Sequence, residues 1–297
     1  MIAVFGPTGV GKTAVAIALA ERLRAAGEHP VAISADALQV YSGLEVLTGA
    51  ATPADQAVLE HRLLSFLPVD AEFSAGQYAE LAHAEIDDVL AARQRPIVVG
   101  GTGLYLRAAL AELSLRPPPP EGARERWTSE LATRGPVALH ALLSARAPSV
   151  AAGIAVTDSQ RIVRALELSD AGELEPAPEQ SELWTDAVRR PTLLVGLVAE
   201  RAELYRRIEA RVEAMIAGGA EAEVRHAQAA GASATARKAL GFDELLIGDV
   251  EGMKRRTRNF AKRQLTWMRK LAGVHVLDTT GREPDEIALR IEALWTG

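Results

Sequence analysis

The chain contains 297 residues, carries a formal net charge of −6 at pH 7 and has no cysteine. With 48% hydrophobic and 24% charged residues, its composition is that of a globular protein, either one large domain or a core with an insertion. The missing cysteine excludes disulfides, thiol catalysis and cysteine-ligated metals. No apolar run reaches membrane-spanning length and no signal peptide is recognisable, so we expect a cytoplasmic protein without membrane contact. Because the net charge is acidic, a nucleic acid would have to meet a local basic patch.

The first motif in the chain is a phosphate-binding loop. The apolar run Met1–Phe5 predicts a strand and the Ala-rich run Ala14–Ala20 predicts a helix. Between them lies the pattern G-x-x-x-x-G-K-[ST], which chance produces in roughly 1% of chains of this length. Its backbone N–H groups and lysine would bind phosphate, commonly a nucleoside triphosphate but also a bare diphosphate, and its last hydroxyl would bind Mg²⁺. The residues of this candidate site are Gly6, Pro7, Thr8, Gly9, Val10, Gly11, Lys12 and Thr13.

An aspartate follows the second predicted strand. Val31–Ser34 is apolar and strand-like, and the carboxyl ends of parallel strands share the edge on which the phosphate-binding loop opens. Asp36 is therefore a candidate site residue. A role as a helix cap or turn former is equally common for an aspartate at such a place, and the sequence leaves both interpretations open.

A second glycine-rich turn follows a third strand. Residues 42–73 show no regular period and predict loops, and residues 75–93 predict a helix. Pro96–Val99 then predicts a buried strand, and the Gly-Gly-Thr-Gly turn after it leads into a helix that ends near residue 112. Thr102 in this turn is a candidate hydrogen-bond donor to a ligand, and a tight turn with a purely structural role is the alternative.

Four consecutive prolines at 117–120 mark a domain boundary, because a polyproline segment is a stiff spacer. The residues after them lack strand patterns and predict helices. We therefore predict an α/β core with a parallel sheet flanked by helices, formed by residues 1–115 and 191–297, and a helical insertion formed by residues 116–190. The predicted helices of the insertion cover about 122–134, 136–145 and 158–171.

Two pairs of arginines are candidates for binding phosphate. Arg161 and Arg164 share a face of the last insertion helix, where solvated or ion-paired arginines are the commoner interpretation. Arg207 and Arg211 lie four residues apart on the predicted helix Arg201–Ile216 and also share a face. Either of these two arginines could stabilise an anion at the edge of the sheet.

The most basic segment is 254–270, which contains eight Lys or Arg residues and no acid. Its apolar residues fall at helical spacing, so one face packs and the other is basic. A solvated helix face is one interpretation, and an RNA or phosphate footprint is at least as well supported, because no acid in the segment compensates the charge. The remaining predicted elements of the core are a strand at 192–197, helices near 219–230, 236–247, 251–272 and 283–295, and a strand at 274–277.

Several stretches together resemble the bacterial tRNA dimethylallyltransferases, also called tRNA isopentenyltransferases. The phosphate-binding loop is shared with many kinases and ATPases, whereas the SAD-x-x-QVY and AKRQ-x-TW motifs are far more particular. The similar stretches, which run in the family's order across nearly the whole chain, are GPTGVGKT (Gly6–Thr13), SADALQVY (Ser34–Tyr41), GGTGLY (Gly100–Tyr105), RIVRALE (Arg161–Glu167), LYRRIEARVEAM (Leu204–Met215), ALGFDEL (Ala239–Leu245) and AKRQLTW (Ala261–Trp267).

The resemblance implies a prenyl transfer. Members of the family transfer the dimethylallyl group of dimethylallyl diphosphate to N6 of the tRNA adenosine beside the anticodon, position 37. They thereby form isopentenyladenosine and release diphosphate. The resemblance also implies Mg²⁺ as a cofactor, with the hydroxyl of Thr13 as a ligand, and the tRNA anticodon stem-loop as the partner of a monomeric enzyme.

The same resemblance implies roles for individual residues. Asp36, Thr13, Lys12 and Arg211 would be catalytic, because the carboxylate can accept the proton of the attacking amine and the other groups can stabilise the leaving diphosphate. Arg211 would join the phosphate-binding loop in the diphosphate site. The residues implied in tRNA binding are Asp36, Ala37, Leu38, Gln39, Thr102, Gln160, Arg161, Arg164, Arg255, Arg258, Lys262 and Arg263.

The chain departs from the family pattern at four places. Ala37 stands where the family has serine, the loop 49–53 lacks the family's lysine, His61 is alone where the family has two histidines, and the segment after Glu167 diverges. Three other functions are weighed on the residues. A small-molecule kinase or NTPase would not explain the basic helix, and a prenyltransferase of free adenine nucleotides would need no RNA clamp. A non-enzymatic RNA-binding module is opposed by the intact phosphate-binding loop and Asp36.

Overall fold

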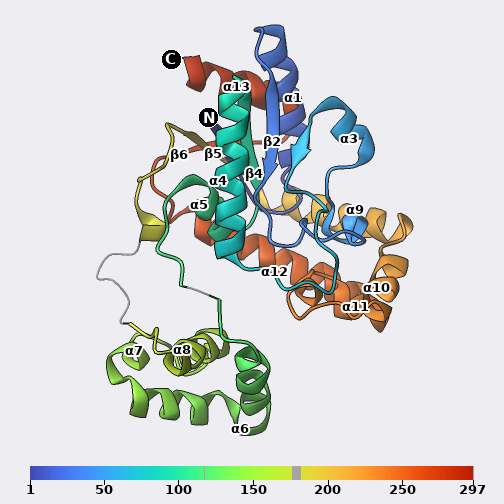
Figure 1. Ribbon diagram of the computed structural model, residues 1–297. Coiled ribbons are helices and arrows are strands. Elements are labelled where there is room, and N and C mark those ends of the chain that lie inside the picture. The colour runs from blue at the N-terminus through green and yellow to red at the C-terminus, as the bar shows by residue number, and fades with distance from the viewer. Residues whose placement is uncertain (117, 176–181, 297) are drawn as a thin grey trace. The chain divides into compact units, whose positions relative to one another are not determined.

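The computed structural model describes residues 1–116, 118–175 and 182–296, which form two compact units (Figure 1). Unit 1 comprises Met1–Leu113 and Leu183–Gly297, and unit 2 comprises Ser114–Glu182. Residues 183–190, which the sequence analysis assigned to the insertion, therefore lie in unit 1. Within the described part of the chain, no helix has the length and apolar character needed to cross a membrane.

Unit 1 is built on a parallel sheet, as predicted. The described residues form six strands in the order β3-β2-β4-β1-β5-β6. Phe5 at the end of β1 pairs with Gly100 at the end of β4 and with Gly196 of β5, which continues to Val198, so these three strands point their carboxyl ends to the same edge. Residues that follow them consequently meet at one edge of the sheet. The strands are β1 (Ile2–Phe5), β2 (Pro30–Ser34), β3 (His61–Arg62), β4 (Arg95–Gly100), β5 (Leu193–Val198) and β6 (Val274–Asp278).

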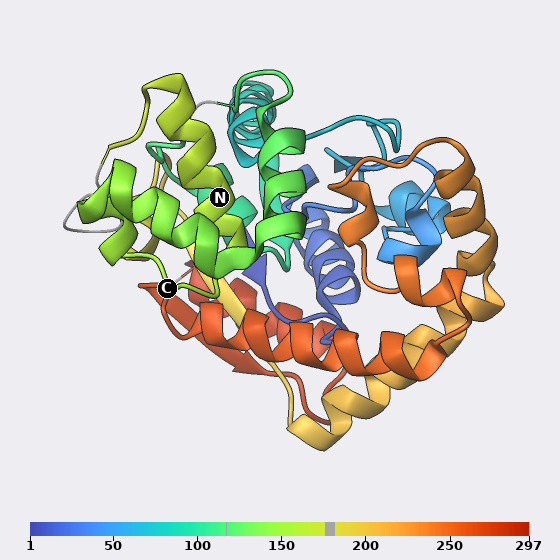
Figure 2. The ribbon, with the colours of Figure 1, turned by 90° about the horizontal axis from the view of Figure 1, so that it is seen from below.

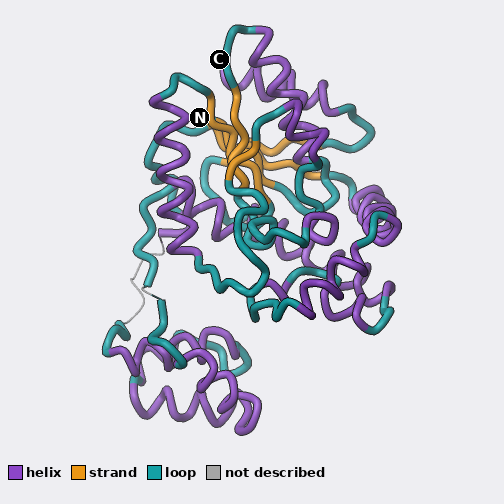
Figure 3. Tube along the Cα trace, turned by 45° about the vertical axis from the view of Figure 1, so that its right-hand side comes forward, coloured by secondary structure: helices purple, strands orange, loops and turns teal. Residues whose placement is uncertain are grey.

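Helices enclose this sheet (Figure 3). α1 (Lys12–Ala25) and α13 (Pro284–Thr296) share one buried apolar cluster with β1, β4 and β5. The buried apolar residues of α4 (Ala75–Ala91) and α5 (Gly103–Leu110) pack these two helices against β4. The other helices of unit 1 are α2 (Glu45–Thr48), α3 (Pro53–Val58), α9 (Arg201–Ala217), α10 (Ala220–Ala229), α11 (Phe242–Leu246) and α12 (Val250–Met268), with 3-10 turns at Glu182–Trp184 and Ala236–Lys238.

The secondary structure predicted for two stretches of unit 1 was partly wrong. Residues 42–73 were predicted as loops but contain α2, α3 and β3, because elements of two to six residues are too short to show a period. Thr52 and Asp55 nevertheless form a capping box that starts α3. The single helix predicted over 236–247 is instead a 3-10 turn followed by α11, because Gly241 adopts a left-handed conformation with φ 95° between them.

Unit 2 is helical. It contains α6 (Ala123–Arg146), α7 (Pro148–Ala152) and α8 (Ser159–Ala171), which pack through a small apolar core that includes Trp127 and Leu166. Gly135 and Pro136 interrupt α6, whose two halves match the two helices predicted there. Unit 2 thus has its own core, and its described residues, 114–116, 118–175 and 182, add no strand to the sheet.

Candidate active site

The phosphate-binding loop lies between β1 and α1, as its sequence context predicts. Gly11 adopts a left-handed conformation, φ 97°, that lets α1 begin at Lys12. The Lys12 ammonium folds back over the loop and donates to the carbonyl oxygens of Gly6 at 3.0 Å and Pro7 at 3.1 Å. Burial, together with a smaller contribution from the Arg211 guanidinium, lowers the pKa of Lys12 to about 8, and Asp36 opposes both effects. A desolvated ammonium in this setting is a strong anion-binding group.

Arg211 reaches the same place from α9. Its Nη2 donates to the carbonyl oxygens of Thr48 at 3.4 Å and Gly49 at 3.2 Å. A Cβ atom at Gly49 would lie 1.8 Å from that nitrogen, so a larger residue there would displace the guanidinium, and the left-handed φ of 59° also favours glycine. The Nε of Arg211 is buried and has no hydrogen-bond partner within the described residues. Burial lowers the pKa of Arg211 and Asp36 opposes this, so the guanidinium lies within electrostatic reach of Asp36 and presents a donor that an anion would satisfy.

Asp36 is half-buried directly after β2. Its Oδ1 accepts a hydrogen bond from the Leu38 N–H at 3.0 Å, so the turn-forming role considered from the sequence is present. The Ala37 N–H donates to the Thr102 hydroxyl at 3.4 Å, which ties the residue after Asp36 to the glycine turn, residues 100–103. Thr102 therefore accepts a protein hydrogen bond in this structure and fixes the segment that carries the carboxylate.

The predicted tRNA residue Gln39 lies within a protein network. Its Oε1 accepts from the Ser34 hydroxyl at 3.3 Å, and its Nε2 donates to the same Thr48 and Gly49 carbonyls that Arg211 contacts. Gln39 and Arg211 thus hold one loop from two elements. Because these amide contacts are internal, the structure offers a supporting role for Gln39 beside the anion site.

Gln264 on α12 is a functional candidate that the sequence analysis missed. Its Oε1 accepts from the Thr8 N–H at 2.8 Å, and its Nε2 donates to the Gly101 carbonyl at 2.8 Å. The helical spacing carried the signal, because Gln264 falls on the buried face with Ala261 and Met268, where a polar side chain needs partners. The basic residues next to Gln264 in the sequence lie on the opposite, exposed face of α12.

Trp267 packs against the same glycine turn. A Cβ atom at Gly103 would lie 2.2 Å from the Trp267 ring, so only glycine allows this close approach. The ring centroids of Trp267 and Trp184 are 4.7 Å apart, and the Lys270 ammonium lies 5.2 Å from the Trp184 centroid. α12 therefore contacts the glycine turn through both an amide and an aromatic ring.

Arg207, the alternative to Arg211 in the sequence analysis, contacts the far side of the phosphate-binding loop. Its Nη1 donates to the Val10 carbonyl and the Thr279 hydroxyl, each at 3.4 Å, and its Nη2 pairs with Glu203. These contacts join the loop to the end of β6. Arg207 therefore supports the phosphate-binding loop from behind, and Arg211 is the arginine within electrostatic reach of Lys12 and Asp36.

The basic segment of α12 is partly neutralised. Lys254 pairs with Glu213, Arg256 with Glu244 and Arg258 with Glu209, at 3.0, 2.5 and 2.7 Å. The expectation that no acid compensates this charge was wrong, because α9 and α11 supply carboxylates from distant parts of the sequence. Figure 2 shows α9 alongside α12.

One row of basic residues on α12 remains exposed. The outer stripe, as we name it, consists of Arg255, Lys262 and Arg269, which are seven residues apart and so share a face. Within the described residues none of the three forms an ion pair. Arg263 is also exposed and lies over the Phe260 ring at 5.5 Å. The outer stripe is the part of α12 that offers free positive charge.

The predicted tRNA residues of unit 2 differ in their surroundings. Arg164 donates to Glu167 at 3.2 Å and to the Arg116 carbonyl at 3.3 Å, whereas Gln160 is exposed and the Arg161 side chain is 73% exposed. Glu167 is fully buried and also receives two bonds from Arg124. Arg164 thus belongs to an internal charge cluster, whereas Gln160 is exposed and Arg161 pairs with Asp158 at 3.5 Å while most of its side chain stays in solvent.

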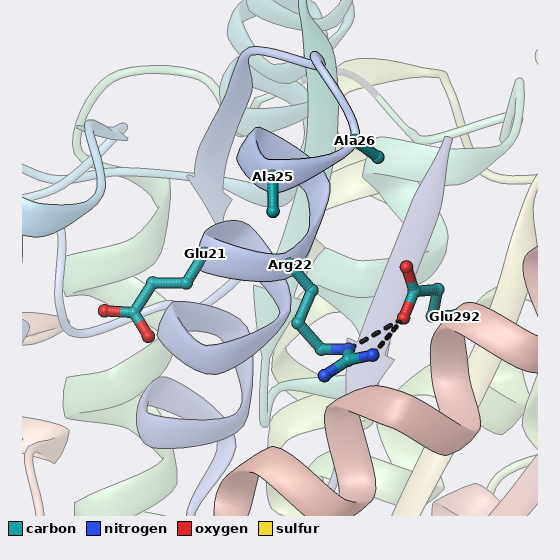
Figure 4. Close-up of a pocket in the computed structure, with 5 residues that line it drawn as sticks. All are labelled: Glu21, Arg22, Ala25, Ala26 and Glu292. Atoms are coloured by element: carbon teal, nitrogen blue, oxygen red, sulfur yellow. Dashed lines mark hydrogen bonds and ion pairs between the residues drawn. The ribbon is translucent and has the colours of Figure 1, made fainter.

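The hollow in Figure 4 is separate from this site. It is lined by Glu21, Arg22, Ala25, Ala26 and Glu292, at the end of α1 remote from Lys12. Arg22 pairs with Glu292 at 2.6 Å, and the Glu21 carboxylate leaves the lining of the hollow acidic rather than cationic. About 20 Å of helix separates the two ends of α1, at roughly 1.5 Å per residue.

The donor set of the site fits a weakly ligated Mg²⁺. Within the described residues no group of three or more His, Asp or Glu side chains converges as a metal cage. The half-buried hydroxyl of Thr13 and carboxylate of Asp36 are hard oxygen donors at the phosphate-binding loop. Mg²⁺ characteristically uses one or two such groups together with substrate phosphates and water.

A parallel sheet with this loop at its carboxyl edge defines a phosphate-binding α/β protein with an inserted helical unit. The family model "IPP transferase" matches residues 39–271, which is most of the chain. The tRNA dimethylallyltransferase of Kineococcus radiotolerans is 40% identical over 98% of this chain and 95% of its own length. The tRNA dimethylallyltransferase of Geobacillus thermodenitrificans is 36% identical over 99% of this chain and 95% of its own length. The chain therefore belongs to the IPP transferase family, that of the tRNA dimethylallyltransferases.

Solved structures agree with this assignment. The full-length tRNA isopentenylpyrophosphate transferase of Bacillus halodurans is similar with a TM-score of 0.71 and 30% identity, covering 100% of this chain and 95% of that one. A eukaryotic dimethylallyltransferase, described as acting on tRNA, shares the fold with a TM-score of 0.75 at 21% identity, over 100% of this chain and 79% of its own. The predicted α/β fold with flanking helices is thus confirmed.

Proposed function

We propose that this protein transfers the dimethylallyl group of dimethylallyl diphosphate to N6 of the adenosine next to the tRNA anticodon and releases diphosphate. Membership of the family supports the reaction class. The observation that carries the proposal at the site is the convergence of Lys12, Arg211 and Asp36, with the buried Nε of Arg211 lacking a partner among the described residues. The two cations can stabilise an anionic leaving group at the phosphate-binding loop, and the carboxylate can accept a proton from an amine nucleophile.

The cations stabilise the leaving group. When the bond between C1 of the allyl group and the diphosphate oxygen breaks, its electron pair stays with the diphosphate. Lys12 exchanges its contacts with the loop carbonyls for phosphate oxygens, and Arg211 adds its Nε–H. Preorganised donors of this kind act where negative charge develops and need no reorganisation during the reaction.

Asp36 takes the proton. The N6 lone pair of adenine attacks C1, which makes the nitrogen acidic, and the proton moves from N6 to the carboxylate oxygen. Oδ1 is held by the Leu38 N–H, and no described residue hydrogen-bonds Oδ2. The carboxylate is thus oriented by one oxygen and available at the other, as a general base requires.

Mg²⁺ would be held by the Thr13 hydroxyl together with diphosphate oxygens, and it would neutralise part of the leaving group's charge. Thr13 follows Lys12 at the start of α1, so both groups address the same end of the loop. The protein's own contribution there is to orient the diphosphate.

The anticodon stem-loop would meet basic side chains on both units. The outer stripe on α12 supplies phosphate contacts, and the exposed Gln160 and Arg161 of unit 2 supply further polar contacts. Of the implied tRNA residues on α12, Arg258 is occupied by Glu209, so Arg255 and Lys262 are the stronger candidates. The target adenosine must leave its stack to bring N6 to Asp36.

Mass analysis of nucleosides tests the function. Unmodified tRNA is incubated with the protein, Mg²⁺ and dimethylallyl diphosphate, without any nucleotide. We expect adenosine carrying one dimethylallyl group at the position beside the anticodon, and one diphosphate released for each. Product on free AMP but not on tRNA would move the protein to the adenylate prenyltransferases, and phosphorylated product with ATP would move it to the kinases.

A further inference from the structure

We infer that Gln264 is a positioning residue, whose side-chain amide fixes the phosphate-binding loop against the glycine turn and so sets the place of the leaving diphosphate relative to Asp36. This inference rests on the proposed prenyl transfer. It assigns a role to a residue on the inner face of α12, away from the outer stripe.

Both ends of the amide are used. Oε1 accepts from the Thr8 N–H and Nε2 donates to the Gly101 carbonyl, each at 2.8 Å, and the side chain is 4% exposed. Thr8 lies in the loop after β1 and Gly101 in the turn after β4, whereas Gln264 comes from α12. One side chain therefore spans the two walls of the site.

The walls touch where the amide joins them. A Cβ atom at Gly101 would lie 2.4 Å from Nε2 of Gln264 and 3.3 Å from both the Gly6 carbonyl and the Lys12 ammonium. The neighbouring Thr102 accepts from the Ala37 N–H. A change at Gln264 thus acts on the lysine through the loop and on the Asp36 segment through the turn.

The chemistry of the residue is specific. A carboxamide offers one acceptor and two donor hydrogens without charge, which the Thr8 N–H and the Gly101 carbonyl require. An ionised glutamate can accept from Thr8 but faces the Gly101 carbonyl with a negative oxygen. A leucine satisfies neither group. The Thr8 N–H is committed to Gln264, so the loop binds phosphate with its other amides.

The test uses three variants of the full chain. Gln264→Leu removes both bonds, and Gln264→Glu keeps one. Thr257→Val is the matched control, because Thr257 is 5% exposed on the same helix face and its hydroxyl bonds only to the Met253 carbonyl of α12. Steady-state rates with dimethylallyl diphosphate and tRNA, tRNA affinity and thermal melting are measured on each.

We expect Gln264→Leu to lower kcat/KM for dimethylallyl diphosphate about 10- to 100-fold in the folded protein, because small displacements of reacting groups have effects of this size. Its tRNA affinity should stay within about twofold, since the outer stripe is untouched. Thr257→Val should keep both kinetic constants. Near-normal constants for Gln264→Leu, or equal losses in Gln264→Leu and Thr257→Val, would overturn the inference.

Gln264→Glu provides a readout that lost stability would not mimic. A protonated carboxyl group donates and accepts as the amide does, so the rate relative to wild type should rise as pH falls toward the carboxyl pKa, which burial raises from about 4.3. A ratio that stays flat with pH also overturns the role, even if Gln264→Leu does not fold. Failure of the wild-type protein to prenylate tRNA would instead refute the proposed function.

Discussion

Two clusters in this protein combine arginine with a carboxylate, and they differ in whether the charges are satisfied. In unit 2 the buried Glu167 receives hydrogen bonds from Arg124 and Arg164, so the carboxylate is fully paired. In unit 1 Lys12 and Arg211 contact only carbonyl oxygens of the protein, and Asp36 forms no ion pair with either within the described residues. The first cluster holds a fold together, and the second leaves positive charge for an anion.

The comparison teaches how to recognise a site where the sequence shows only charged residues. A buried charge is energetically costly unless it is paired. A buried cation without an ion-pair partner at the edge of the sheet therefore indicates a site for an anionic ligand. The same criterion separates the two sides of α12. Its paired residues stabilise packing against α9 and α11, and its outer stripe remains for a partner.

The largest expected effect is that of Asp36→Asn, which removes the base but keeps size and hydrogen bonding. Single-turnover transfer should slow by about 10²–10⁴-fold, the usual contribution of general base catalysis. The affinities for tRNA and dimethylallyl diphosphate should be nearly preserved. A role only as the turn former seen with Leu38 would instead lower the melting temperature and leave turnover within a few-fold of wild type.

Next in size is the contrast between Arg211→Ala and its matched control Arg164→Ala. Loss of one preorganised donor to the leaving group should slow transfer by about 10²–10³-fold. Arg164→Ala should leave turnover and tRNA affinity unchanged and lower the free energy of unfolding by about 1–3 kcal/mol, because it removes one bond to a charged carboxylate. Chemical denaturation and single-turnover rates on both proteins check this; wild-type turnover in Arg211→Ala would break the comparison.

A smaller effect is expected from pH. The pKa of Lys12 is lowered to about 8, and a bound diphosphate would raise it again by favouring the ammonium. Affinity for dimethylallyl diphosphate should therefore be full below pH 8 and weaken by up to tenfold per pH unit above about 8. Calorimetric Kd values across this range measure the slope. Lys12→Arg, which stays charged, should flatten it, and a flat wild-type curve contradicts the prediction.

The smallest effect concerns salt dependence. Replacing Arg255 and Lys262 by glutamine should reduce the slope of log Kd for tRNA against log salt by roughly 2, about one for each phosphate that is no longer neutralised. Replacing Arg256 and Arg258 by glutamine changes the net charge equally but removes ion-paired residues, and should leave the slope nearly unchanged. Equal slopes for the two double variants would contradict the prediction that ion-paired and free basic residues on α12 differ in their contacts with tRNA phosphates.

The sequence was sufficient for every described strand except the two-residue β3 and for most helices, because apolar runs bounded by turn residues determine them locally. It also named Lys12, Asp36 and Arg211 as candidate site residues, and the structure places these three groups within electrostatic reach of one another. It could not predict the partners. Besides Glu251 of α12 itself, the carboxylates that pair with the basic residues of α12 come from α9 and α11. The role of Gln264 depends on Thr8 and Gly101, which are distant in the chain but follow neighbouring strands of the sheet.

The close pair of Trp184 and Trp267, whose ring planes are tilted by 53°, gives this protein an optical signal of its own. Indole rings 4.7 Å apart couple their transitions, which produces circular dichroism in the near ultraviolet and lets excitation pass between them. Trp267 lies against Gly103, so displacement of the glycine turn alters the coupling. The other tryptophans, Trp127 and Trp295, lie in the core of unit 2 and in α13. Stopped-flow spectroscopy can thus follow rearrangement of the turn during a single catalytic cycle without any attached dye.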